Sequence, residues 1–149
     1  MSDAWVYLES GELIKAKSFG ANKTDTGVVV FNSSLSGIIE MISDESNRDI
    51  FINLALSEVG VSGANDEDMS SSAVACKGIF TRNYSEKYSN FRATMSLSQL
   101  LKRENKMGIC DIDTRFITTQ IRNNQSLRVV VSTEISDKDE LKKILEQSK

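Results

Sequence analysis

The sequence of 149 residues contains no histidine, no proline and only two cysteines. Without histidine there is no Ser-His-Asp triad and no Cys-His pair, so the commonest kinds of nucleophilic catalysis are excluded. A conventional zinc site also needs several His or Cys ligands, and we therefore expect no catalytic residue and no metal site. Cys76 and Cys110 lie far apart without CxxC spacing, which predicts two buried or half-buried thiols in a reducing compartment.

Long apolar runs and a strong excess of charge are also missing. No apolar segment approaches the roughly 18 residues that a membrane span needs, and residues 1–10 lack the basic start of a signal peptide. The net charge is −3, and the basic residues are scattered or have acidic neighbours, unlike the basic face of a nucleic-acid-binding protein. We therefore expect a cytoplasmic protein with no membrane partner and no nucleic-acid partner.

What the sequence does contain is an alternation of short apolar segments and polar turns. Strand patterns cover residues 4–9, 12–18, 28–31, 50–56, 73–82, 107–110 and 127–133, and the first two should form a hairpin around Ser10 and Gly11. Residues 20–27 and 57–72 have the composition of loops.

Helix patterns cover four further segments. They are residues 38–43, a segment with Leu97, Leu100 and Leu101 after a capping box, a segment that begins at Asp113 and ends at residues 123–124, and a last segment that Ser136 caps. About six or seven strands and three or four short helices follow in irregular order, without a repeat or a linker. This pattern predicts one mixed α+β domain over residues 1–149, with helices packed on a sheet.

Five short segments carry a resemblance to a known family. They read YLExG from Tyr7, FNSSLSG from Phe31, GVSGAN from Gly60, SNFR from Ser89 and GICDIDTR from Gly108. In order and spacing they resemble the N-terminal domain of the small, glutamine-hydrolysing subunit of carbamoyl-phosphate synthase. None of the segments is diagnostic alone, and the resemblance rests on all five in register from about residue 5 to residue 135.

The resemblance implies a swivelling β/β/α domain with a non-catalytic role. In the family, this domain precedes a glutamine amidotransferase domain whose Cys, His and Glu release ammonia from glutamine, and the large subunit uses that ammonia to make carbamoyl phosphate. The sequence ends at Lys149, so we expect the amidotransferase domain to be absent and the chain alone to be inactive. The implied partners are the large subunit, the amidotransferase domain and possibly glutamine, in pyrimidine and arginine biosynthesis. No cofactor is implied.

One residue is assigned to glutamine by the resemblance. The family has a D-P-S-Y segment whose serine helps to bind glutamine, and this sequence has DESN at residues 44–47, which places Ser46 at that position. Glu45 stands where the family has proline, and its negative charge would repel the carboxylate of the substrate. An ordinary loop serine is the alternative.

The resemblance also suggests interface residues. Asp113 and Arg115 would anchor the domain against a neighbouring domain or subunit through charge-assisted hydrogen bonds. Alternatively, Asp113 only caps a helix and Arg115 is a surface residue of its first turn. Asn90 and Arg92 are further interface candidates, and the alternative for both is that they brace their own loop.

Two other functions stay open. The chain could be a stand-alone or redesigned small-molecule-binding domain, with a cleft around Ser46 and residues 57–65. It could also be an enzyme that uses carboxylates or lysines, although no spacing of these residues indicates a site. The G-x-x-G-x-N segment at residues 60–65 lacks the lysine of a P-loop, so turn geometry explains it better.

Overall fold

The computed structural model describes residues 2–32, 42, 44–54, 74–84, 97–124 and 127–148. The strands are β1 (Ser2–Leu8), β2 (Leu13–Ser18), β3 (Thr24–Asn32), β4 (Ile50–Leu54), β5 (Gly78–Phe80), β6 (Met107–Cys110) and β7 (Leu127–Ser132). The helices are α2 (Leu97–Arg103), α3 (Thr114–Asn124), α4 (Lys138–Gln147) and the short 3-10 helix η1 (Glu45–Asn47). Among these residues, no helix combines the length and the apolar character that crossing a membrane requires.

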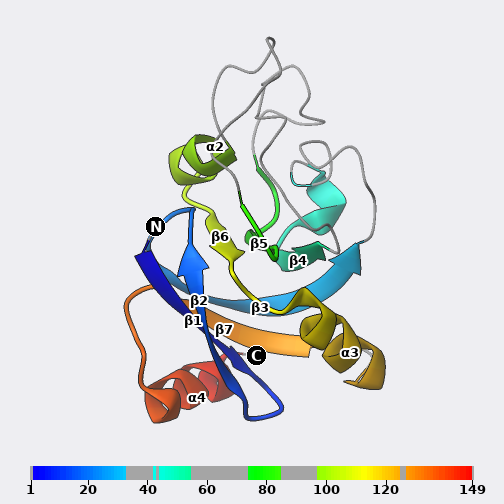
Figure 1. The fold of residues 1–149 in the computed structure, drawn as a ribbon, viewed down its shortest axis with the longest axis vertical. Coiled ribbons are helices and arrows are strands. Elements are labelled where there is room, and N and C mark those ends of the chain that lie inside the picture. The colour runs from blue at the N-terminus through cyan, green and yellow to red at the C-terminus, as the bar shows by residue number, and fades with distance from the viewer. Residues whose placement is uncertain are drawn as a thin grey trace.

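The seven strands form one closed barrel in the order β1-β2-β6-β5-β4-β3-β7 (Figure 1). Strands β3, β4, β5 and β6 run parallel to one another, and the other pairings are antiparallel. The mixed α+β class and the number of strands are as predicted. The closure was not predicted, and it arises because β7 pairs with both β1 and β3. A sheet that closes on itself leaves no edge strand.

The N-terminal hairpin is confirmed, and two other boundaries are corrected. β1 and β2 pair from Ser2↔Ser18 to Tyr7↔Leu13, and the turn between them contains Gly11 at φ 101°. The predicted loop at residues 20–27 is wrong in its second half, because β3 already begins at Thr24 and pairs there with Ser132. The segment TDTG has no apolar run, and its strand character comes from the ladder to β7. The strand predicted over 73–82 is limited to three residues of β5.

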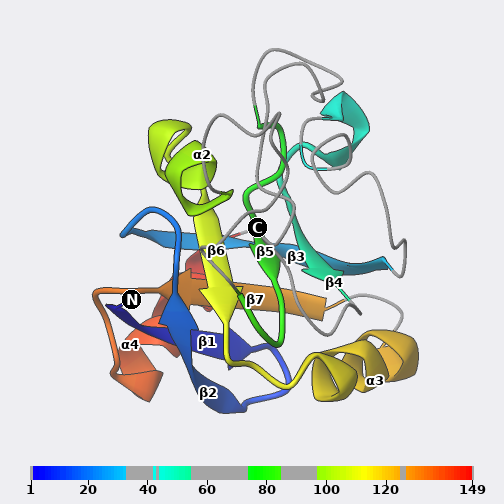
Figure 2. The ribbon, with the colours of Figure 1, turned by 45° about the horizontal axis from the view of Figure 1, so that its top comes forward.

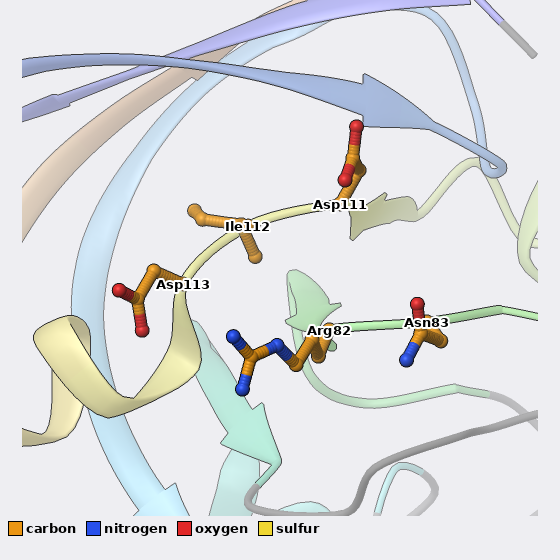
Figure 3. A pocket seen from close by; sticks show the side chains of 5 residues that line it. All are labelled: Arg82, Asn83, Asp111, Ile112 and Asp113. Carbon is orange, nitrogen blue, oxygen red and sulfur yellow. The ribbon is translucent and has the colours of Figure 1, made fainter.

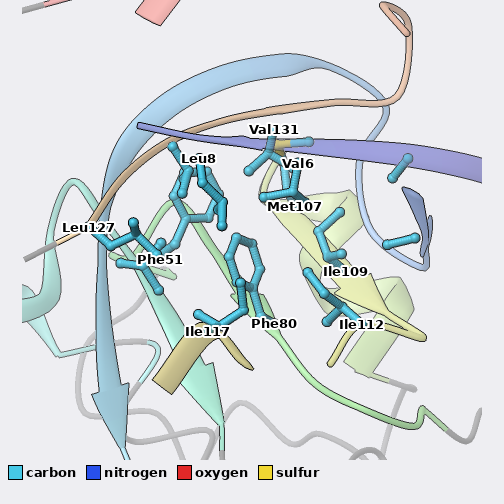
Figure 4. Close-up of a cluster of buried hydrophobic side chains, with 14 residues drawn as sticks. Val6, Leu8, Phe51, Phe80, Met107, Ile109, Ile112, Ile117, Leu127 and Val131 are labelled. Atoms are coloured by element: carbon cyan, nitrogen blue, oxygen red, sulfur yellow. The ribbon is translucent and has the colours of Figure 1, made fainter. Parts of the chain in front are cut away.

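The core consists of three clusters. The largest fills the barrel and includes fourteen buried residues from all seven strands, the β6–α3 connection and α3 (Figure 4). A second cluster lies under α2 and contains Leu97, Leu100 and Leu101, as the helix pattern predicted. A third, smaller cluster lies outside the barrel, where Leu141 and Leu145 of α4 pack on Tyr7 and Val130. Burying one such side chain contributes roughly 1.5–3 kcal/mol.

Helices α3 and α4 contact different parts of the barrel. α4 packs on β1 and β7, whereas α3 contacts β3, β4 and β7, and Figure 2 shows the two helices at opposite sides. The predicted cap of α4 is off by one residue, because Asp137 rather than Ser136 accepts the N–H of Glu140, at 3.3 Å. At the other end of α4, the guanidinium of Arg128 donates to the carbonyl oxygen of Leu145 at 3.0 Å.

Two backbone segments approach each other closely at the junction of β2 and β6. These strands share only the pairs Lys17↔Cys110 and Ser18↔Ile109. A Cβ atom on Gly20 would lie 2.4 Å from the backbone nitrogen of Gly108, which is far inside van der Waals contact. Glycine is therefore required at residue 20 by the close approach of two backbones. Residues 38–43, predicted as a helix, lie outside the described residues except for Ile42, which is buried.

Candidate functional site

A small hollow lies at the carboxyl ends of β5 and β6, next to the start of α3 (Figure 3). Its volume is about 170 Å³. It is lined by residues that directly follow these two strands, namely Arg82, Asn83, Asp111, Ile112 and Asp113. In open α/β sheets and in α/β barrels alike, ligands commonly bind at the carboxyl ends of the parallel strands. The hollow is therefore the first place to consider for function.

Backbone pairing continues past the ends of both strands and shapes the hollow. The N–H of Thr81 donates to the carbonyl of Ile109 at 2.8 Å, and the N–H of Asp111 donates to the carbonyl of Arg82 at 3.0 Å. Asp111 then takes a φ of 57°, a left-handed conformation that aspartate tolerates better than most residues. The chain thus turns out of β6, and buried Ile112 fixes the turn against the core.

Asp113 is the N-cap of α3. Its Oδ1 atom accepts the backbone N–H groups of Arg115 and Phe116, each at 3.1 Å. The prediction that α3 begins after Asp113 is confirmed, and the predicted end at residues 123–124 agrees with Thr114–Asn124. Arg115 is exposed in the first turn of α3. The interface roles of Asp113 and Arg115 stay predictions.

A buried polar residue that the sequence analysis missed connects β4 to α3. Asn53 is fully buried, and its Nδ2 donates to the carbonyl of Thr114 at 3.1 Å and to the hydroxyl oxygen of Thr118 at 3.0 Å. Its Oδ1 atom has no hydrogen-bond partner among the residues that the structure describes. An asparagine inside the apolar run IFINLAL was the available signal, because a buried amide must find partners. Asn53 therefore attaches the first turns of α3 to the parallel strands.

The charges around the hollow are of both signs. Figure 3 shows the side chains of Asp111 and Asp113 on opposite sides of Ile112, with the guanidinium of Arg82 nearer to Asp113. Asp111 lies close enough to Lys17 to contribute to the raised pKa of that lysine, although the larger causes are the hydrogen bond and charge of Asp3. The hollow can therefore accept and donate hydrogen bonds to charged groups of a ligand or a partner surface.

Ser46 lies elsewhere, in η1, which precedes β4. The hydroxyl and the backbone N–H of Ser46 both donate to Oδ1 of Asp44, each at 3.0 Å, and these hydrogen bonds lower the pKa of the Asp44 carboxyl. The side chain is exposed, and its oxygen can still accept a hydrogen bond. The neighbouring Glu45 forms an ion pair with Arg48, whose Nε lies 3.0 Å from the carboxylate. This pair weakens the repulsion that Glu45 would exert on a substrate carboxylate.

The structure thus does not bring the predicted site residues into one cluster. Ser46 stands before β4, while Asp113 and Arg115 stand after β6. Because β4 and β6 run parallel, Ser46 lies at the amino ends of the parallel strands and Asp113 at their carboxyl ends. Asn90 and Arg92 lie outside the described residues.

Both cysteines are buried in the cluster under α2, as predicted. Burial raises the pKa of the Cys76 thiol to about 12 and that of the Cys110 thiol to about 11. Both side chains are therefore protonated at neutral pH, whereas a thiol nucleophile must be available as thiolate. Their role is packing in the core.

The family model and the similar proteins all indicate the same family. Residues 6–131 match the family described as "Carbamoyl-phosphate synthase small chain, CPSase domain". The chain is 44% identical over 145 residues to the carbamoyl phosphate synthase small chain of Campylobacter jejuni, an alignment that covers 97% of this chain and 39% of that protein. It is 42% identical over 149 residues to the chloroplastic small chain of Oryza sativa, covering 100% of this chain and 33% of that protein. The chain therefore spans well under half the length of these relatives.

Among solved structures, the chain is similar to an aminopeptidase from Aneurinibacillus sp. strain AM-1. The TM-score is 0.50, the sequence identity is 12%, and the match covers 87% of this chain and 30% of that one. At this identity the likeness concerns the fold alone.

Proposed function

The chain belongs to the carbamoyl-phosphate synthase small-chain family, and on that premise we propose that it is the N-terminal, non-catalytic part of a glutamine-hydrolysing small chain. It packs against the amidotransferase domain and against the large subunit, and so supports glutamine-dependent carbamoyl phosphate synthesis for pyrimidines and arginine. The observation that carries the proposal is the match of residues 6–131 to the family. The swivelling β/β/α character of the domain is part of the same proposal.

Two features of the chain favour a non-catalytic role. The sequence contains no histidine that could serve as a general base for a nucleophile. Cys76 and Cys110 are buried thiols with raised pKa values, so neither offers a reactive thiolate. We therefore assign the hydrolysis of glutamine to the amidotransferase domain, and to this chain the task of holding that domain and the large subunit together.

Ser46 is the proposed contact of this chain with glutamine. Its hydroxyl proton is used on Asp44, so Ser46 would act toward glutamine as a hydrogen-bond acceptor, for the amino group or the side-chain amide. The ion pair of Glu45 with Arg48 supports this assignment, because it reduces the negative charge beside the serine.

The test is size-exclusion chromatography of the chain alone and mixed with the large subunit or with an amidotransferase domain. We expect a complex that co-elutes with the large subunit. Separate elution from both candidates at micromolar concentrations would contradict the proposal.

A second candidate is a stand-alone small-molecule-binding domain, and the hollow beside Arg82 and Asp113 favours it. The hollow is lined by charges of both signs, which suit a small zwitterion such as an amino acid. Calorimetric titration of the chain with glutamine tests this function. An absence of heat at millimolar glutamine would count against it.

A further inference from the structure

The exposed face of α3 is basic in an acidic protein. The net charge of the chain is −3, yet α3 contains two arginines and no Asp or Glu among its eleven residues. Arg115 and Arg122 are both exposed, as are Thr119 and Asn123 between and beside them. We call this set, Arg115, Thr119, Arg122 and Asn123, the α3 face.

The arginines of the α3 face differ from Arg48, Arg103 and Arg128, which have partners among the described residues. Arg48 pairs with Glu45, and Arg128 donates to the C-terminal end of α4. In contrast, the guanidinium groups of Arg115 and Arg122 form no hydrogen bond and no ion pair in the described part of the chain, and the same holds for Arg82 at the hollow beside α3. Arginine presents five donors in a rigid fork and is enriched at protein interfaces. Exposed guanidinium groups with no partner among the described residues indicate that the α3 face is available to an acidic partner.

The acidic residues at the start of α3 do not neutralise this face. Asp113 is engaged with the backbone N–H groups of Arg115 and Phe116, and it forms no salt bridge with the guanidinium of Arg115. Along the helix, seven positions separate Arg115 from Arg122, which places them on the same side and roughly 10 Å apart along the axis. That spacing is too wide for one small anion such as phosphate. It fits two carboxylates on an extended protein surface.

We propose that the α3 face docks on an acidic surface of the carbamoyl-phosphate synthase large subunit. This inference rests on the proposed function and names the part of the chain that makes the contact. Of the two proposed partners, the large subunit is favoured because it is a separate chain, and charge complementarity between separate chains speeds their encounter. A domain in the same polypeptide is already held at high effective concentration and gains less from such steering.

The experiment compares two charge-reversal variants of the chain in binding to the purified large subunit. The test variant is R115E/R122E on α3. The control is K142E/K143E on α4, which changes the net charge by the same amount at exposed positions of the other helix. We expect the dissociation constant to rise about tenfold or more for R115E/R122E and to stay within about twofold for K142E/K143E. Thermal melts of both variants check that the fold is kept.

Two further binding measurements vary the salt concentration and offer a nucleic acid as an alternative partner. Raising NaCl should weaken the wild-type complex and should have a smaller effect on R115E/R122E, because screening acts on the same charges. Binding of a short DNA duplex that needs Arg115 and Arg122, with unchanged affinity for the large subunit, would assign the face to nucleic acid and overturn the proposal.

The remaining outcomes separate this inference from the function on which it rests. If the wild-type chain and R115E/R122E bind the large subunit equally well, the complex exists and the α3 face is not its contact, so this inference alone fails. If the wild-type chain does not bind the large subunit at all, the proposed function fails and this inference fails with it.

Discussion

The two halves of the barrel differ in the direction of their strands and in how these strands are connected. Strands β7, β1 and β2 are antiparallel neighbours, and a tight turn joins β1 to β2. Strands β3 to β6 are parallel, so a long crossover must join β3 to β4, β4 to β5 and β5 to β6. Four of the five segments that resemble the small-subunit family, from Phe31 onward, begin within a parallel strand or between two of them. The antiparallel half holds the barrel closed, while the parallel half carries the sequence features that identify the family.

The helices of the two halves repeat this contrast on their surfaces. α4 covers β1 and β7, and its three lysines share the helix with three acidic residues. On such a mixed surface, the charged side chains can interact with opposite charges on the same helix and with water. α3 lies at the parallel half and contains two arginines and no Asp or Glu among its eleven residues. The difference indicates that α4 is a structural cover and that α3 is available for a partner.

The largest predicted effect concerns how deeply each helix is anchored. Ile117 of α3 and Leu141 of α4 are both fully buried, but Ile117 joins the fourteen-residue cluster inside the barrel and Leu141 a four-residue cluster outside it. A cavity inside the barrel can relax less, so we expect Ile117→Ala to cost about 4 kcal/mol and Leu141→Ala about 3 kcal/mol of unfolding free energy. Urea denaturation of both variants measures this. A larger loss for Leu141→Ala would invert the ranking of the two halves.

The second prediction concerns the junction of the halves at β2 and β6. A methyl group on Gly20 would overlap the backbone of Gly108 and Lys106, which flexible side chains cannot relieve. We expect Gly20→Ala to destabilise the fold by about 3 kcal/mol, measured by denaturant unfolding. Gly11→Ala is the control, because its Cβ meets nothing within 4 Å and only its φ of 101° is unfavourable. Equal losses in the two variants would show that the close approach at the junction is unimportant.

The third prediction concerns the attachment of α3 to the parallel strands through Asn53. Replacing Asn53 by alanine removes the donor to Thr114 and Thr118 and leaves a buried carbonyl without that partner. We expect a loss of about 2 kcal/mol in the free energy of unfolding. Thr118→Ser keeps the hydroxyl and is the matched control, with a smaller loss. If Asn53→Ala is as stable as the wild type, the orientation of α3 is set by its apolar contacts alone.

Much of the fold could be predicted from local pattern. The hairpin, the strand at residues 107–110, the amphipathic α2 and the boundaries of α3 all have signals within a few residues, and each prediction is confirmed. Barrel closure could not be predicted in this way, because it depends on β7 pairing with two strands more than ninety residues earlier in the sequence. The early start of β3 was missed for the same reason, since Thr24 belongs to a strand only through its partner Ser132.

The candidate site was predictable in its parts but not in its arrangement. Sequence resemblance selected Ser46, Asp113 and Arg115 one by one, and only the parallel order of β4 and β6 separates the first from the other two. The role of Asp113 as a cap has a local signal, a short acidic side chain before an apolar periodicity. No local signal predicts that Arg115 and Arg122 lack partners among the described residues, because this depends on which acidic residues fold nearby.

The smallest predicted effects concern the caps of the two helices, where the comparison can be made atom for atom. Asp113 accepts two backbone N–H groups at 3.1 Å, whereas Asp137 accepts one at 3.3 Å. Removal of an N-cap side chain typically costs about 1 kcal/mol, so we expect Asp113→Ala to lose about 1 kcal/mol and Asp137→Ala less. Urea unfolding measures the losses, and Asp113→Asn should recover most of the first because an amide oxygen also accepts. A loss of affinity for the large subunit in Asp113→Asn, with stability kept, would mean that the carboxylate contacts the partner. Unchanged affinity would restrict Asp113 to the cap and leave docking to the arginines of α3.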